Sequence, residues 1–161
     1  MLKIRIFKAI YIRMENANKI GAGIIAIDKQ TGELLLGQRA YGSNWAPYGG
    51  THEIKDGNVK NTAKREFSEE TGGVDTNYEI SKTPFFVQKT PEVIFYSFLG
   101  IFDKKFQPNI TIEHLNSGWF GLDNLPSNLL PGFAELIQTK GEELRAIIDK
   151  ITSENNHPEL A

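Results

Sequence analysis

The sequence predicts an α/β fold, because segments with the composition of strands alternate with two segments of helical periodicity. The apolar run at residues 93–102 (VIFYSFLGIF) is the strongest strand, and residues 59–71 carry apolar side chains at helical spacing. The chain has 161 residues, with no internal repeat and no linker, and is long enough to bury the core of one domain. We therefore predict a single mixed α/β domain spanning residues 1–161.

The N-terminal part of the sequence predicts strands and a tight turn. Residues 3–12 (KIRIFKAIYI) alternate imperfectly and are rich in Ile, Phe and Tyr. Residues 22–28 (AGIIAID) form a short apolar run of the kind found in buried strands. Residues 33–40 (ELLLGQRA) follow the turn at 29–32 (KQTG), so we expect these last two strands to pair as a hairpin.

A glycine-rich segment at residues 42–58 separates the hairpin from the first helix. It lacks any periodicity and predicts a long loop, and long loops inside compact domains are usually functional or disordered. The helix is expected at residues 59–71, where Val59, Ala63 and Phe67 recur at four-residue spacing before a pair of glycines that end it.

Three further strands are expected in the second half of the chain. Residues 84–88 and 93–102 are strand-like, and residues 117–126 predict a last strand followed by a tight turn. The aromatic side chains of the central strand are expected to lie in the core; they are Phe95, Tyr96 and Phe98.

The C-terminal part of the chain predicts a second helix. The helical pattern starts at Pro131 and continues to residue 151, with Gly141 as a candidate break. Residues 153–161 are polar and expected to fray.

The composition excludes several kinds of site. There is no cysteine, which rules out disulfides, thiol catalysis and thiolate metal ligands. The net charge of -2 gives no reason to expect non-specific binding to nucleic acid. Charges interrupt the apolar residues at the start of the chain, so neither a signal peptide nor a transmembrane segment is predicted. We expect a cytoplasmic protein without a membrane partner.

The first helix carries Glu66, Glu69 and Glu70 on one side, bordering its apolar stripe. Partly buried carboxylates in a cluster must be protonated, paired or bound to a cation, and hard ions such as Mg²⁺ and Mn²⁺ prefer carboxylate ligands. The alternative is an exposed helix whose acids are solvated, with Arg65 and Glu69 as a weak surface pair.

The segments WAPYGGTHE and TAKREFSEETGG resemble the signature of the Nudix family. The signature runs Arg-Glu-apolar-x-Glu-Glu-x-Gly after a glycine and a loop acid. The matching positions are Gly50, Arg65, Glu66, Phe67, Glu69, Glu70 and Gly72, with Gly49 before the opening glycine. The resemblance covers most of residues 20–140 and implies an α/β/α sandwich with a mixed β-sheet.

One feature departs from that signature. The family pattern places five residues between the glycine and the loop acid, and seven more before the arginine. Counting from Gly50 leads to Asp56, but eight residues then separate Asp56 from Arg65, so the loop is one residue longer. Asp56 and Glu53 are both candidates for the loop acid, whose role in the family is to orient the arginine.

The resemblance implies a hydrolase, dependent on Mg²⁺ or Mn²⁺, that cleaves the pyrophosphate bond of a nucleoside diphosphate linked to another moiety. The product would be a nucleoside monophosphate or an equivalent phosphate. It implies metal ligands at Glu66, Glu69 and Glu70 and at the carbonyl of Gly50, with Arg65 orienting the acids. The general base is expected to be Glu113 or Glu69.

Contacts to the substrate are expected from the loop and the hairpin. The candidates are Arg39, Trp45, Tyr48 and Glu53, with His52 and His114 as further side chains that reach a phosphate. Trp45 and Tyr48 are equally compatible with stacking on a base and with packing against the sheet. Surface positions are the alternative for Arg39 and the two histidines.

An alternative function is a non-catalytic Nudix-like module that binds a nucleotide or a protein. The expected partner in either case is a small nucleotide, and nucleic acid is expected only if capped RNA is the substrate. The strand predicted at residues 3–12 is also suited to a homodimer contact.

Overall fold

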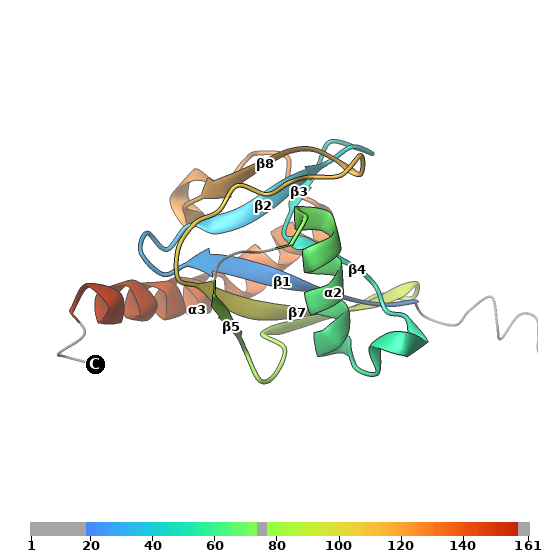
Figure 1. The fold of residues 1–161 in the computed structure, drawn as a ribbon, viewed down its shortest axis with the longest axis horizontal. Helices are drawn as coiled ribbons and strands as arrows, with labels where there is room; N and C mark the ends of the chain where they lie inside the picture. Colours follow the sequence, from blue (N-terminus) through green and yellow to red (C-terminus); the bar gives the residue numbers. More distant parts are fainter. Residues whose placement is uncertain (1–18, 74–76, 158–161) are drawn as a thin grey trace, which may run out of the picture.

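The computed structural model describes residues 19–73 and 77–157, which form a sheet with a helix on each side (Figure 1). The strands are β1 (Lys19–Asp28), β2 (Leu34–Arg39), β3 (Trp45–Ala46), β4 (Tyr48–Thr51), β5 (Tyr78–Ile80), β6 (Phe86–Lys89), β7 (Val93–Phe102) and β8 (His114–Phe120). The helices are α2 (Val59–Thr71) and α3 (Pro131–Asn156), with short 3₁₀ helices η1 (Ile54–Asp56) and η2 (Leu122–Asn124).

The sheet is mixed because β1 pairs in both directions. It runs parallel to β7 over ten residue pairs, from Lys19↔Val93 to Asp28↔Phe102. Its second half is antiparallel to β2, the predicted hairpin partner, and its first half is antiparallel to β4. The change of partner along β1 brings β4, and the helix that follows it, against the first half of the strand.

The alternation of side chains along β1 divides the interior into two cores. Ile25 and Ile27 face α3 and pack in a cluster with its Phe133, Leu136, Leu144 and Ile148. Ala22, Ile24 and Ala26 face α2 and pack in a cluster with its Ala63 and Phe67. Figure 1 shows α2 in front of the sheet and α3 behind it. The predicted α/β/α sandwich is therefore confirmed.

Helix α2 has the predicted bounds, and local chemistry fixes both of its ends. The side chain of Asn58 accepts a hydrogen bond from the backbone N–H of Asn61 at 2.9 Å, which caps the first turn. Gly72 ends the helix in the left-handed conformation, with φ at 78°. The buried side of the helix carries Ala63 and Phe67, as expected from their spacing.

Residues 42–58 are more regular than the expected loop. They contain β3, β4 and η1, since backbone pairing with β2 and β1 supplies order that the side-chain pattern does not encode. The short strand β5 was not expected, and β8 begins at His114, three residues earlier than predicted.

Helix α3 extends five residues beyond the predicted end, so residues 153–156 are helical rather than frayed. Its apolar face ends at Ile148 and Ile151, which pack on the core. Residues 153–156 are exposed, and the N–H of His157 donates to the carbonyl of Ser153 as the helix ends. Gly141 does not interrupt the helix. The strand predicted at residues 3–12 lies outside the described residues.

Neither helix in residues 19–73 and 77–157 combines the length and the apolar character that crossing a membrane requires.

Candidate active site

An acidic cleft of about 330 Å³ lies between α2 and the segment that leads into β8. Five of the predicted acids line it: three come from one side of α2, one precedes η1, and the fifth comes from the segment before β8. The lining residues are Glu53, Arg65, Glu66, Glu69, Glu70, Thr111, Ile112 and Glu113. The structure therefore brings Glu113 to the three helical glutamates, although more than forty residues separate them in the sequence.

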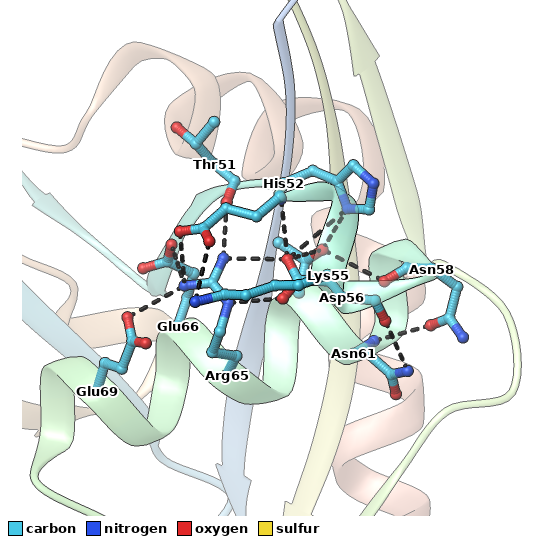
Figure 2. A network of polar contacts seen from close by, with 11 residues as sticks. Thr51, His52, Lys55, Asp56, Asn58, Asn61, Arg65, Glu66 and Glu69 are labelled. Carbon is cyan, nitrogen blue, oxygen red and sulfur yellow. Dashed lines mark hydrogen bonds and ion pairs between the residues drawn. The ribbon is translucent and has the colours of Figure 1, made fainter.

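Arg65 ties the helix to the preceding turn (Figure 2). Its Nε and Nη2 donate to the two carboxylate oxygens of Asp56, at 2.7 and 3.0 Å, and Nη2 also donates to the carbonyl of Thr51 at 2.9 Å. Its Nη1 donates to Glu66 at 3.0 Å and to Glu69 at 3.1 Å. All three nitrogens of the guanidinium are engaged, so its plane is fixed.

Asp56 is the acid that faces the arginine. Its side chain is buried, and it also accepts from the backbone N–H of Glu53 at 3.0 Å and from the hydroxyl of Thr62 at 2.9 Å. The two-point bond from Arg65 holds the pKa of Asp56 well below its usual range. The carboxylate of Glu53 is half exposed, lies 3.8 Å from Arg65 and is closer to Lys55, at 3.0 Å. The geometry thus favours Asp56 over Glu53 as the loop acid.

The extra loop residue is absorbed at the end of η1. This short helix brings the backbone N–H of Glu53 and the carboxylate of Asp56 together, and Gly57 then leaves it with φ at 79°. A positive φ of this kind is easily reached only by glycine, and a Cβ at Gly57 would meet nothing within 4 Å. The added residue therefore changes the turn without displacing the acid from Arg65.

His52 lies behind Asp56 and is not among the residues that line the acidic cleft. Its Nδ1 is 2.6 Å from the hydroxyl of Thr62, and that hydroxyl donates to Asp56. When the hydroxyl gives its one hydrogen to Asp56, Nδ1 is the donor in its contact with Thr62. His52 thus supports the loop acid, and its contacts do not include a cleft side chain.

Glu70 is buried at the inner end of the cleft. Its only bond among the described residues is from the backbone N–H of Gly49, at 3.1 Å, and no described cation forms an ion pair with it. Burial raises the pKa of Glu70 to about 8, and the neighbouring Glu66 and Glu113 add to the shift. The Gly49 bond and the charge of Arg39 oppose the shift without cancelling it.

Glu66 packs directly against the glycine that opens the signature. A Cβ placed on Gly50 would lie 2.4 Å from the carboxyl carbon of Glu66, so a side chain here would displace that carboxylate. Burial raises the pKa of Glu66, and its hydrogen bond with Arg65 partly offsets this effect. The backbone of Gly50 therefore lies against the carboxylate of Glu66.

The chemistry of the cleft suits a hard divalent cation. It holds carboxylates whose charge its one arginine does not balance, next to the backbone of Gly50. In the part of the chain that the structure describes, however, no three Asp, Glu or His side chains are arranged to hold a metal ion. Glu66 and Glu69 each direct an oxygen at Arg65 instead. Each carboxylate uses one oxygen in that bond, and its second oxygen makes no bond to Arg65.

A second cavity, of about 440 Å³, opens on the α3 side of the sheet and includes Glu70 in its lining. Arg39, Tyr48 and His114 also line it, and the ring of His114 lies 4.7 Å from that of Tyr48. Burial lowers the pKa of His114. Arg39 and His114 are thus close to the acids, a position that sequence spacing did not reveal.

Of the two predicted stacking residues, Tyr48 is buried in the core and Trp45 is partly buried against it. Tyr48 is only 1% exposed, and burial raises its pKa to about 12. Trp45 packs edge-on against Phe120, with ring centroids 5.2 Å apart. Of the two alternatives for these residues, the structure favours packing. Thr111 and Ile112, which line the cleft, carried no motif that would have identified them.

The comparisons with known proteins agree with this architecture. The NUDIX domain model matches residues 17–139. No curated protein is similar enough in sequence to match the chain. A Caenorhabditis elegans Ap4A hydrolase binary complex has 20% identity and a TM-score of 0.65, covering 78% of this chain and 98% of that one. A NUDIX hydrolase from Nitrosomonas europaea has 22% identity and a TM-score of 0.66, covering 78% and 71%.

A third similar structure is an ADP-ribose pyrophosphatase from Streptococcus suis, with 27% identity and a TM-score of 0.54, covering 72% of this chain and 82% of that one. The family match spans more than half of the chain and includes every residue that lines the acidic cleft. The chain therefore belongs to the NUDIX domain family.

Proposed function

We propose that the protein hydrolyses the pyrophosphate bond of a nucleoside diphosphate linked to another moiety, with Mg²⁺ or Mn²⁺ as the cofactor. The observation that carries this proposal is the acidic cleft, where Glu66, Glu69, Glu70 and Glu113 line one cavity. Glu70 also lines the larger, mostly apolar cavity. A molecule with a diphosphate at one end and an apolar group at the other matches this pair of cavities.

The metal is assigned to the α2 side of the cleft. Glu66, Glu69 and Glu70, with the carbonyl of Gly50, are the ligands that we propose. A bound divalent ion supplies charge neutralisation for the diphosphate and lowers the pKa of a coordinated water. The burial of Glu70 among like charges supports this assignment, since a nearby cation would favour its charged form.

Arg65 acts as a positioning residue in this proposal. It is held by Asp56 and the carbonyl of Thr51, and it reaches Glu66 and Glu69 from that fixed base. Its guanidinium would keep the two glutamates close to the ligand geometry before an ion binds. We assign it no proton transfer, because an arginine keeps its proton at any relevant pH.

The general base is proposed to be Glu113, with Glu69 as the alternative. Both are exposed in the cleft and available to a water molecule, and they lie on opposite walls of it. Glu113 is not bonded to Arg65, whereas Glu69 accepts a hydrogen bond from it. A base must be free to take a proton, which favours Glu113.

The names of similar structures suggest which substrates to test first. One is an Ap4A hydrolase and another an ADP-ribose pyrophosphatase. Dinucleoside polyphosphates and ADP-ribose therefore lead the panel, followed by nucleotide sugars, oxidised nucleoside triphosphates and capped RNA. The predicted homodimer contact at residues 3–12 is not needed for this chemistry.

The test is a turnover assay over this panel with Mg²⁺, Mn²⁺ or EDTA, read as phosphate-containing products. We expect metal-dependent release of a nucleoside monophosphate or an equivalent product. Glu113→Gln and Glu69→Gln are then compared. The control is Glu79→Gln, because Glu79 is an exposed residue of β5. The variant that lacks the general base should have a flatter pH–rate profile than wild type. A variant that lacks a metal ligand should instead need a higher metal concentration for activity. Metal binding without turnover of any panel member would instead indicate the non-catalytic binding module.

A further inference from the structure

Phe95 is a large aromatic side chain that lies outside both cores. The sequence predicted that Phe95 lies in the core, together with Tyr96 and Phe98 of the same strand. Phe98 is buried and Tyr96 packs on the α2 core, but Phe95 is only partly buried. Among the described residues, neither core cluster contains Phe95, and none of the close aromatic pairs includes it.

Three glycines, from β1 and β4, lie against one face of the Phe95 ring. A Cβ on Gly21 would lie 2.8 Å from Cδ2 of the ring, and a Cβ on Gly23 would lie 3.2 Å from Cζ. A Cβ on Gly49, in β4, would lie 2.9 Å from the same Cζ. A Cβ at any of the three would press on the ring, so the glycines leave it room against the backbone. Gly23 and Gly49 also let β1 and β4 approach closely, because a Cβ on Gly23 would lie 2.6 Å from the carbonyl of Tyr48 and one on Gly49 would lie 2.7 Å from Cα of Gly23.

The side of Phe95 that does not contact these glycines borders the 440 Å³ cavity. The opposite wall is the start of α3, with the apolar side chains of Leu130, Phe133 and Leu136. The cavity falls within the range of about 300 to 1,000 Å³ that is typical of small-molecule sites. It therefore has room for a flat group over the ring.

Polar side chains lie next to the Phe95 ring in the lining of the same cavity. Gln88 is the direct cross-strand neighbour of Phe95 in β6, and Ser97 follows two residues later on the same face. The amide of Gln88 donates to Glu135 of α3. A flat hydrophobic surface bordered by an amide and a hydroxyl matches a nucleobase, which has an apolar face and a polar rim.

We propose that Phe95 is a specificity-determining residue, on which the nucleobase of the substrate stacks. This inference rests on the proposed function, because the cavity is assigned to the nucleoside by way of Glu70, which also lines the acidic cleft. In this proposal Phe95 takes the place of the predicted stacking residues, because Tyr48 is buried and Trp45 packs against Phe120. The base contributes affinity through the ring, and the carboxylates act only on the phosphates.

The test measures binding of nucleosides, which need neither metal nor turnover. Adenosine, guanosine, cytidine and uridine are titrated in EDTA against wild type, Phe95→Leu, Phe95→Tyr and Phe95→Trp, with ribose as the probe that lacks a base. At least one nucleoside should bind wild type more tightly than ribose. Phe95→Leu should weaken that nucleoside by about 5- to 100-fold, the range for loss of one stacked base. Phe95→Tyr and Phe95→Trp should retain most of the affinity, because both keep a ring.

Tyr41→Ala is the matched control, since Tyr41 is 97% exposed and lines neither cavity. Its nucleoside affinity should equal that of wild type. In unmodified protein, nuclear Overhauser contacts between the base protons and the Phe95 ring give a readout that does not depend on any variant folding. A wild type that prefers no nucleoside to ribose, a Phe95→Leu variant with unchanged affinity, or the absence of these contacts would each overturn the proposal.

This outcome is separable from that of the proposed function. Failure of every panel substrate in Mg²⁺ and Mn²⁺ would remove the hydrolase assignment, while nucleoside binding in EDTA would still decide the role of Phe95. If turnover is found, Phe95→Leu should raise KM for the nucleotide substrate and change kcat little, because stacking is made equally in the ground state and the transition state.

Discussion

Asp56 and Glu70 are two buried carboxylates beside the same helix, and their surroundings change their acidity in opposite directions. Asp56 receives two hydrogen bonds from Arg65 and one from Thr62, and its pKa falls. Glu70 receives one bond from a backbone N–H, stands among like charges, and its pKa rises to about 8. Both side chains have little exposure to solvent. Burial is the main cause of the rise at Glu70, whereas at Asp56 the hydrogen bonds from Arg65 outweigh the effect of burial.

The difference indicates which acid is structural and which is available for chemistry. The charge of Asp56 is already neutralised by a partner inside the protein, so it needs no ligand. The charge of Glu70 is not, and a group of this kind at a cavity is a candidate for function. Each of the following experiments removes or tests one side of this contrast.

The largest effect is expected for Glu70→Gln. The amide keeps the shape of the side chain but removes the charge, so turnover should fall by at least about 100-fold, as for the loss of one electrostatic contact to a reacting group. The measurement is kcat with saturating Mg²⁺ on the best panel substrate. Glu79→Gln should match wild type, and equal activity in the two variants would exclude Glu70 from the metal site.

A smaller loss is expected for Asp56→Asn. Arg65 would lose its charged partner, and its bonds to Glu66 and Glu69 would no longer be oriented, so activity should fall by about 10- to 100-fold. The melting temperature should also fall, because a guanidinium of low exposure is left without its main acceptor. Glu53→Gln is the matched control and should change both quantities little. The reverse ranking would make Glu53 the loop acid.

The smallest effect is a change of stability with pH in the metal-free protein. The pKa of Glu70 rises from 4.5 to about 8, so the folded state binds its proton more tightly than the unfolded state. Its effect on the free energy of unfolding is therefore absent below pH 4.5 and increasingly destabilising up to about pH 8. Asp56 has the opposite sign: its lowered pKa gives stability that is present above its ordinary pKa of 3.8 and lost as the pH falls below it.

Thermal melting in EDTA between pH 4.5 and 8 measures this effect. Replacement of Glu70 by Gln should flatten the decline in stability over that interval, while leaving the loss of stability at acid pH, to which Asp56 contributes. A decline that is identical in wild type and Glu70→Gln would show that Glu70 titrates near its ordinary pKa in the folded protein.

The sequence predicted the parts of the fold that depend on local pattern. Helix α2 could be placed because Val59, Ala63 and Phe67 fall on one face and Gly72 follows. The short strands β3, β4 and β5 could not, since two to four residues carry no periodicity and are defined by pairing with distant strands. The end of α3 was also missed, because its last residues are polar and exposed, so their composition gives no sign that the backbone hydrogen bonds of the helix continue through them.

For the site, the signature determined which residue types stand on α2, and the spacing Glu66, Glu69, Glu70 follows from the helix alone. Only the tertiary structure decided which loop acid meets Arg65, because the reach of Asp56 depends on how the 3₁₀ turn and Gly57 absorb one residue. It also decided that Trp45 and Tyr48 pack inward while Phe95 lies open on glycines. A side chain's exposure depends on what the rest of the chain places over it, and that is a property of the assembled fold.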